Sequence, residues 1–303
     1  MTLSKKIDFA LIIEVKNANP NGDPLNGNRP RTDFGGFGEI TDVCLKRKLR
    51  DRLQDAGHAI FVQSDDRKKD SMTSLKNRAT DSEVGLGEDA FKFDAKKGIT
   101  PEATAKKACD KWFDVRAFGQ VFAWSGDKGA KKGKKGEETA ESADAGASNA
   151  NGVSIPVRGP LTIQSAFSKQ PVSVTSTQIT KSVSGDGDGT KRGSDTMGMK
   201  HRVDKGIYFT YGAITPQLAE RTGFSDEDAH IIKDLLPKLF EGDASSARPE
   251  GSMSVLHWFW WEQNGKTPKY SSAKVHKSLT VNEDGSFEIS ELEGLAPEIG
   301  DGF

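Results

Sequence analysis

An α+β fold is predicted for this chain of 303 residues by three features of its sequence. Short segments rich in β-branched and aromatic residues recur along it, two segments carry apolar residues at helical spacing, and long polar stretches separate them. The mean hydropathy is −0.60 and the formal net charge is −1. No overall electrostatic field therefore indicates a nucleic-acid partner, and any basic surface has to come from local clustering.

The first predicted strand covers residues 7–15, whose apolar sequence is typical of a buried strand. A helix is expected over 40–57, because Leu45, Leu49 and Leu53 form one stripe. The other elements are predicted strands at 112–124, 152–174, 253–261 and near 274–281, and a helix at 226–240 that Pro237 should end or kink. The core order strand, helix, strand, strand, helix, strand is the β-α-β-β-α-β pattern of a ferredoxin-like, or RNA-recognition-type, sheet.

Three polar excursions interrupt this core. Residues 64–110 are expected to form a helical insertion. Residues 126–151 contain no apolar residue larger than alanine, so this segment is predicted to be disordered. Residues 172–214 are typical of two β-rich arms around a Gly-rich tip. Function is expected on these excursions, because binding residues concentrate on loops that a rigid scaffold positions.

The two cysteines, Cys44 and Cys109, form no C-x-x-C pair, which argues against a disulfide framework and favours a reducing cytoplasm. The N-terminal segment is typical of a first strand and not of a signal peptide. No apolar run approaches the roughly 20 residues that cross a bilayer. We therefore expect a cytoplasmic protein.

The opening loop, NANPNGDPLNGNRPRTDFGGFG (17–38), is unusually long for a connection inside a domain. Its glycines allow close approach of the backbone to a ligand and can expose N–H groups as an anion nest, with Arg29 and Arg31 beside them. The P-loop pattern is absent here. A phosphate cradle is favoured over a simple turn-rich connector.

The predicted first helix carries five bases next to this loop: Lys46, Arg47, Lys48, Arg50 and Arg52. Lys46 and Arg50 share one flank of the leucine stripe, and Lys48 and Arg52 share the other, so one ligand cannot use all five. The alternatives are a solvated face with ion pairs within the helix and a contact surface for a phosphate backbone. The adjacent loop favours phosphate.

The arms at 172–214 interleave bases with two methionines: Lys181, Lys191, Arg192, Lys200, His201 and Arg202, with Met197 and Met199. Basic residues beside adaptable apolar ones suit a wedge between stacked bases. The alternative is a flexible hairpin whose charges only keep it soluble.

No catalytic constellation, metal site or cofactor site is predicted. The five histidines are scattered without an H-E-x-x-H pair, and no G-x-S-x-G motif occurs. Asp33 is the one carboxylate placed where a phosphodiester could pass. The aromatic segment VLHWFWW could stack bases, but core or subunit-interface packing is favoured because adjacent strand residues alternate faces.

Five segments together carry a family resemblance: NANPNGDPLNGNRPRTD, LKRKLRDRL, FDVRAFG, GPLTIQSAFSKQPVSV and TMGMKHRVDKGIYFTYG. They resemble the backbone subunit of type I-C CRISPR Cascade complexes, a member of the RAMP superfamily. The match covers nearly the whole chain except the 126–151 insert and part of the tail. The first motif is long and idiosyncratic, which makes the resemblance specific.

The resemblance implies a right-hand architecture: a palm of RNA-recognition-type fold, helical fingers and an extended β-hairpin thumb. The boundaries it implies are palm at 1–63, fingers at 64–111, palm at 112–171 including the 126–151 insert, thumb at 172–205, and palm with the C-terminal tail at 206–303.

The function it implies is a non-catalytic, RNA-binding subunit of antiviral defence. Copies would assemble head to tail along the CRISPR RNA, and the thumb would displace a nucleotide at regular intervals during pairing with target DNA. Other Cascade subunits and a recruited helicase-nuclease are the further partners. Transferred to this sequence, the implied RNA-binding residues are Asn19, Asn21, Arg31, Thr41, Lys46 and Arg50 in the palm and Thr180, Lys181, Met197, Met199, Lys200, His201 and Arg202 in the thumb.

Two rivals remain. A metal-dependent RAMP ribonuclease acting through Asp33 would cut RNA opposite the guide with Mg²⁺ and lose that activity in Asp33→Ala. A purely structural self-assembling protein would form filaments equally well after RNase treatment.

Overall fold

The computed structural model describes residues 1–125, 152–181 and 197–303. The predicted disordered insert at 126–151 and the Gly-rich tip at 182–196 lie outside the described residues.

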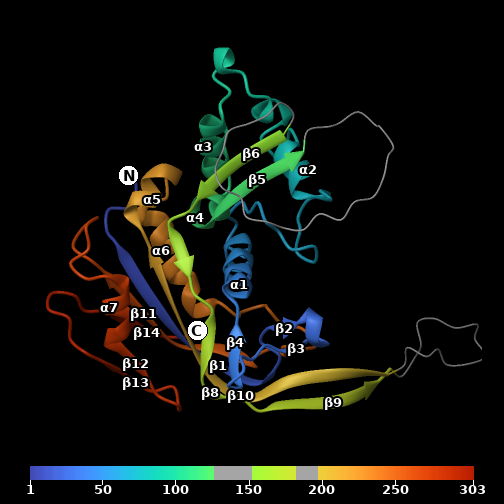
Figure 1. The fold of residues 1–303 in the computed structure, drawn as a ribbon, viewed down its shortest axis with the longest axis vertical. Helices are drawn as coiled ribbons and strands as arrows, with labels where there is room; N and C mark the ends of the chain where they lie inside the picture. The colour runs from blue at the N-terminus through green and yellow to red at the C-terminus, as the bar shows by residue number, and fades with distance from the viewer. Residues whose placement is uncertain (126–151, 182–196) are drawn as a thin grey trace, which may run out of the picture.

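An eight-stranded antiparallel sheet forms the body of the molecule (Figure 1). Its central strands lie in the order β11-β1-β10-β8, flanked by β14 and β4, while β7 and β9 also pair with β10. Their bounds are β1 Ile7–Ala18, β4 Phe37–Ile40, β7 Leu161–Ile163, β8 Ala166–Pro171, β9 Val174–Thr180, β10 Met197–Ile214, β11 Met253–Glu262 and β14 Glu298–Asp301.

Both faces of the sheet are covered. Odd-numbered residues of β1, such as Phe9 and Leu11, pack against the leucine stripe of α1 (Asp42–Asp55) and against α6 (Asp226–Leu235). Even-numbered residues, such as Ile12, pack on the opposite face against α7 (Ser272–Ser278) and the hairpin of β12 (Leu279–Val281) and β13 (Phe287–Ile289). This alternation follows from the period of two along a strand.

The remaining helical turns near the sheet are short: α5 (Pro216–Thr222), η1 (Pro24–Asn26) and η5 (Leu236–Lys238). The predicted helix at 226–240 is confirmed, since α6 ends at Leu235 and a 3-10 turn containing Pro237 follows it. Among the described residues, no helix has the length and apolar character needed to span a bilayer.

A second hydrophobic core lies above the sheet in Figure 1. It is built around Phe61, Trp112 and Phe122, whose rings lie with their centroids 4.7–6.3 Å apart. The elements that contribute to it are α2 (Leu75–Thr80), η2 (Glu88–Phe91), α3 (Pro101–Lys111), α4 (Phe113–Phe118), β5 (Gly119–Ser125) and β6 (Gly152–Arg158), and the exposed turn η3 (Ala95–Lys97) lies between η2 and α3 in the chain.

The strand predicted at 112–124 is wrong in its first half. Residues Phe113–Phe118 form helix α4, and β5 pairs only with β6, outside the large sheet. The reason is that α4 lies between two cores: Phe113 and Ala117 pack with the sheet, while Val115 packs in the second core. In the sequence, Phe113, Val115 and Ala117 alternate with Asp114 and Arg116, and this period of two is typical of a strand.

Two further strand predictions need correction. The segment 152–174 holds three short strands, β6, β7 and β8, of which only the last two join the large sheet. The segment near 274–281 is mostly helix α7, followed by the short strand β12. The predicted order counted 112–124 and 152–174 as its two middle strands, whereas the strands at the centre of the sheet are β11, β1, β10 and β8. In the chain, α1 follows β1, and α6 lies between β10 and β11.

Candidate nucleic-acid interface

The opening loop is a built structure. It folds back as a hairpin of β2 (Gly22–Asp23) and β3 (Arg29–Pro30), here called the loop hairpin. Gly27 and Asn28 both have φ of 59°, the left-handed region that glycine and asparagine tolerate best. A Cβ on Gly22 would lie 1.9 Å from Oδ1 of Asn28, so a larger residue there would displace the Asn28 side chain.

Two asparagines predicted to contact RNA are turned into this loop. Asn19 is 2% exposed and donates from Nδ2 to the carbonyl of Asn28 at 2.7 Å. Oδ1 of Asn21 accepts from the backbone N–H of Thr41 at 3.0 Å and from its hydroxyl at 2.8 Å. The Thr41 hydroxyl in turn accepts from the N–H of Cys44 and caps α1. These three side chains fix the loop against the start of the helix.

The two loop arginines point to different partners. A guanidinium nitrogen of Arg31 lies 3.4 Å from Oδ1 of Asp23, within the loop hairpin. Arg29 is exposed and donates from Nη1 to the hydroxyl of Ser176 on β9, at 3.2 Å. Arg29 thereby connects the loop to the projecting strands.

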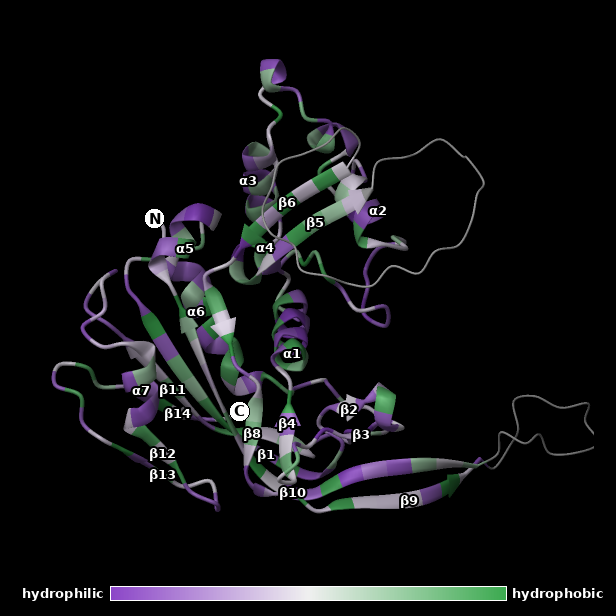
Figure 2. Cartoon of the chain, viewed as in Figure 1, coloured by the Kyte–Doolittle hydropathy of each residue, from purple (hydrophilic) through white to green (hydrophobic). Residues whose placement is uncertain are grey.

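Every base of α1 that the sequence singled out has an acidic partner. Lys46 and Arg50 were the predicted phosphate contacts, and Figure 2 shows how hydrophilic this helix is. The ion pairs are Lys46–Asp42 (2.9 Å), Arg47–Asp51 (2.9 Å), Lys48–Asp243, Arg50–Asp114 (3.0 Å) and Arg52–Asp55 (2.6 Å). Three of the five join residues three or four positions apart on the helix, as in the solvated-face alternative.

Arg50 differs from Lys46 in burial and in role. Its side chain is 13% exposed, and its guanidinium also lies 4.9 Å from the centre of the Phe118 ring. Its partner Asp114 is 1% exposed and also accepts the backbone N–H groups of Phe61 and Val62. Arg50 therefore joins α1 to the second core, whereas the Lys46 side chain is 27% exposed and pairs with a half-exposed carboxylate.

The predicted thumb begins as a two-stranded ribbon, here defined as residues 174–180 of β9 and 197–203 of β10. It projects from the sheet, and Figure 2 shows hydrophobic positions near its outer end. Met197, Met199 and His201 alternate along β10 and so share one side of the ribbon; Lys200 and Arg202 lie on the other.

The methionine side carries exposed apolar surface at its outer end. Met197 and Met199 are 64% and 54% exposed, and their cross-strand neighbours are Thr180 and Gln178. His201 is different, because it is only 7% exposed and shares a hydrogen bond of 2.8 Å between Nδ1 and the Ser176 hydroxyl.

The bases on the other side form the polar surface of the ribbon. Arg202 lies 3.5 Å from Asp204, while Lys200 is exposed opposite Thr177. Lys181 directly follows β9 at the outer end.

Ser176 brings the two predicted parts together. Its hydroxyl contacts both Arg29 of the loop hairpin and His201 of the ribbon. Arg29 was predicted only as a charge beside the loop's anion nest, and Ser176 was not among the predicted site residues. The sequence signal for Ser176 is weak, because its role depends on the pairing register Ser176↔His201, which no local pattern sets.

Asp33 stabilises the turn at the end of the opening loop. Its Oδ1 accepts the N–H groups of Gly35 at 2.8 Å and Phe37 at 2.9 Å. Within 1–125, 152–181 and 197–303, no three His, Cys, Asp or Glu side chains are grouped so that they could hold a metal ion.

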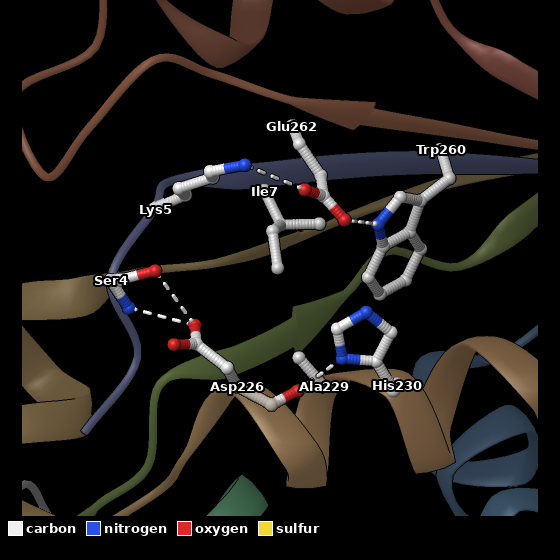
Figure 3. Close-up of a pocket in the computed structure, with 8 residues that line it drawn as sticks. All are labelled: Ser4, Lys5, Ile7, Asp226, Ala229, His230, Trp260 and Glu262. Atoms are coloured by element: carbon white, nitrogen blue, oxygen red, sulfur yellow. Dashed lines mark hydrogen bonds and ion pairs between the residues drawn. The ribbon is translucent and has the colours of Figure 1, made fainter. Parts of the chain in front are cut away.

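A separate hollow of about 310 Å³ lies between β1, α6 and β11 (Figure 3). Its polar groups are paired with one another. Ser4 donates to Asp226, while Lys5 and the indole of Trp260 both contact Glu262. These contacts attach the N-terminal segment to the end of the sheet.

The sequence of most of the chain matches a known protein family. The family model for "CRISPR-associated protein Cas7" matches residues 5–295. The chain belongs to the Cas7 family. A curated Cas7 relative, "CRISPR-associated protein Cas7" of Haloferax volcanii, is 27% identical over 304 aligned positions, which cover 99% of this chain and 82% of the relative.

Chains from solved structures are also similar to this Cas7 family member. One, described as "CRISPR RNA-guided surveillance complex, pre-nicking", is 16% identical with a TM-score of 0.47, covering 92% of this chain and 82% of that chain. Another, "CRISPR RNA-guided surveillance complex", is 16% identical with a TM-score of 0.42, covering 93% and 77%.

Proposed function

We propose that the chain is a non-catalytic backbone subunit of a type I-C CRISPR surveillance complex, and that copies assemble head to tail along the guide RNA. The observation that carries this proposal is the Cas7 family match over residues 5–295. The strand order β11-β1-β10-β8, with α1 and α6 on one face, supports a palm of RNA-recognition type.

The loop hairpin and the ribbon are the parts that would hold the guide. They meet at Ser176, so RNA lying along one would contact the other. Lys200 and Arg202 supply positive charge for phosphates on one side of the ribbon, and Met197 and Met199 supply an apolar wedge on the other.

The geometry distributes the predicted palm residues between two roles. Asn19, Asn21 and Thr41 shape the loop through hydrogen bonds. The ammonium group of Lys46 can leave its half-exposed partner Asp42 and contact a phosphate. Arg50 instead stabilises the fold through its ion pair with Asp114. Loop backbone N–H groups and the ribbon bases then carry more of the guide contact than α1 does.

Sequence specificity would come from base pairing between guide and target DNA, as in other RNA-guided effectors. The partners in this proposal are the CRISPR RNA, the target DNA strand, further copies of the chain and the other Cascade subunits. Cleavage belongs to a recruited helicase-nuclease, and Asp33 shapes a turn through its Oδ1.

The wedge is tested by replacing Met197 and Met199 with serine. The matched control is Ile179→Ser, because Ile179 is also exposed (49%) but lies on the other side of the same ribbon. Permanganate probing of target thymines in the assembled complex should show regularly spaced unpaired positions in the parent and the control. The methionine variant should lose them.

Regular unpaired positions that persist in the methionine variant would contradict the wedge. Loss in both variants would show that the ribbon as a whole, and not its methionine side, interrupts pairing.

A further inference from the structure

A groove runs along the sheet face that α7 and β12 cover, on the side away from α1. Two adjoining hollows of about 340 and 210 Å³ form it, and Lys169 lines both. The larger hollow contains Phe209, Tyr211 and Lys277, and its volume lies at the lower end of the range for small-ligand sites, about 300–1,000 Å³. The smaller one contains Lys205 and Gly206, where the ribbon leaves the sheet.

The floor of the larger hollow is aromatic. The rings of Phe209 and Tyr211 meet edge to face with centroids 5.9 Å apart, and Tyr211 stacks on His276 at 4.6 Å. Phe167 lies directly across from Phe209 on β8 and is 42% exposed. Phe167, Phe209 and Tyr211 together form an aromatic surface that is partly open to solvent.

The charges in the groove favour an anionic ligand. The Nζ of Lys169 lies 5.9 Å from the centre of the Phe209 ring, and Lys277 lines the opposite wall. Among the described residues, no carboxylate lines the larger hollow. Glu283 in the smaller hollow faces two lysines, Lys169 and Lys205. Three further acids lie nearby: Glu39 is across from Phe167 on β4, Glu14 is across from Ile207 on β1 and pairs with Lys16, and the buried Asp8 lies 3.7 Å from His276.

We propose that this groove binds single-stranded nucleic acid, with a base stacked on Phe167 and Phe209 and the adjoining phosphates beside Lys169 and Lys277. Aromatic faces flanked by cations are the combination that binds single strands with little dependence on sequence. The site goes beyond the guide cradle, since it uses none of the loop-hairpin or ribbon residues that contact Ser176. A nucleic-acid strand that passes Lys205, where the ribbon leaves the sheet, can continue into the groove.

The direct test is photo-crosslinking in the assembled complex, with iodouracil placed either in the guide RNA or in the DNA strand. The three arms carry it in the guide, in complementary target DNA or in non-complementary single-stranded DNA. Crosslinked peptides are then mapped by mass spectrometry. Crosslinks to Phe167, Phe209 or Tyr211 in any arm support the groove, and the arm that gives them identifies the strand.

Affinity measurements supply the second readout. A short fluorescent oligothymidylate should bind the parent chain about tenfold more tightly than Phe167→Ser or Lys169→Glu. The matched control is Lys107→Glu, because Lys107 is an exposed lysine of α3 on the far side of the molecule. Guide retention by the loop hairpin and the ribbon should be unchanged in all three variants.

Crosslinks confined to the loop hairpin and the ribbon, with equal affinities for all three variants, would overturn the groove while leaving the proposed function intact. Absence of guide RNA from the particle would instead contradict the proposed function. Protection of Lys169 from acetylation only when copies assemble without nucleic acid would show that a protein covers the groove, and would also overturn it.

Discussion

At the residue scale, two bases of α1 have different roles: Arg50 stabilises the fold, and Lys46 is proposed to bind RNA. Arg50→Ala leaves the buried carboxylate of Asp114 without its cation, so the free energy of unfolding should fall by about 3–5 kcal/mol. Lys46→Ala removes a half-exposed pair and should cost only about 0–1 kcal/mol. Urea denaturation followed by circular dichroism measures both. Equal losses would contradict the different roles assigned to the two bases.

Lys46→Ala also tests the RNA contact. Lys46→Ala should weaken guide retention at low salt for every guide sequence, because a phosphate contact is independent of sequence.

His276 gives the stability a dependence on pH. Burial lowers its pKa below the ordinary value of about 6.5, although Asp8, 3.7 Å away, and the carbonyl of Gly212 oppose that shift. Lys6 lowers the pKa further. The folded state therefore binds fewer protons than the unfolded state below pH 6.5, and stability should fall as the pH drops through that value.

Denaturation between neutral pH and pH 5 measures this effect, and His276→Gln should flatten the fall. The matched control is His230→Gln, because His230 is exposed and its Nδ1 contacts only a backbone carbonyl. A fall that is equally steep in His276→Gln would assign the pH dependence to other groups.

At the scale of elements, Ser176 is expected to couple the loop hairpin to the ribbon. Ser176→Ala removes the hydroxyl that contacts both Arg29 and His201. Hydrogen exchange should then rise in the backbone of both the loop hairpin and the ribbon, because each loses a contact that holds it. Thr177→Ala, one residue along on the opposite side of the ribbon, is the control. Faster exchange in the ribbon alone would show that the two elements are independent.

Local patterns predicted the elements with a single buried face best. The leucine stripe of α1 and the end of α6 near Pro237 were predictable, because each follows from spacing or from the missing proline N–H. α4 was not, because it contacts two cores at once and its residues alternate between apolar and charged, which is the period of a strand. The aromatic strand β11 was predicted to pack in the core or at a subunit interface, and Trp260 and Trp261 are buried in the core.

The site residues show the same limit. Sequence composition identified the loop, α1 and the arms as candidate contacts, but not which side chains are free to bind. Asn19 is buried, His201 is nearly so, and Arg50 pairs with Asp114, a residue 64 positions away in the chain. Long-range partners of this kind depend on the tertiary fold and leave no local signal.

At the scale of the whole molecule, the net charge is near zero, so the attraction of nucleic acid has to come from local basic surfaces and not from an overall electrostatic field. The loop hairpin, the ribbon and the groove all lie on or next to the β8–β10 side of the sheet. The second core lies away from them, on the other side of α1. The proposed guide contacts and the second core therefore lie in different parts of the molecule.

The most direct test of the central claim is purification of the chain after co-expression with a CRISPR RNA and the partner subunits. Size exclusion, the ultraviolet absorbance ratio and sequencing of the bound RNA are measured on the same sample. A large particle that contains several copies of the chain and uniform CRISPR RNA, and that dissociates on RNase treatment, is the predicted result. A particle of the same size that forms without RNA, or a chain that stays free of nucleic acid with all partners present, would contradict the account.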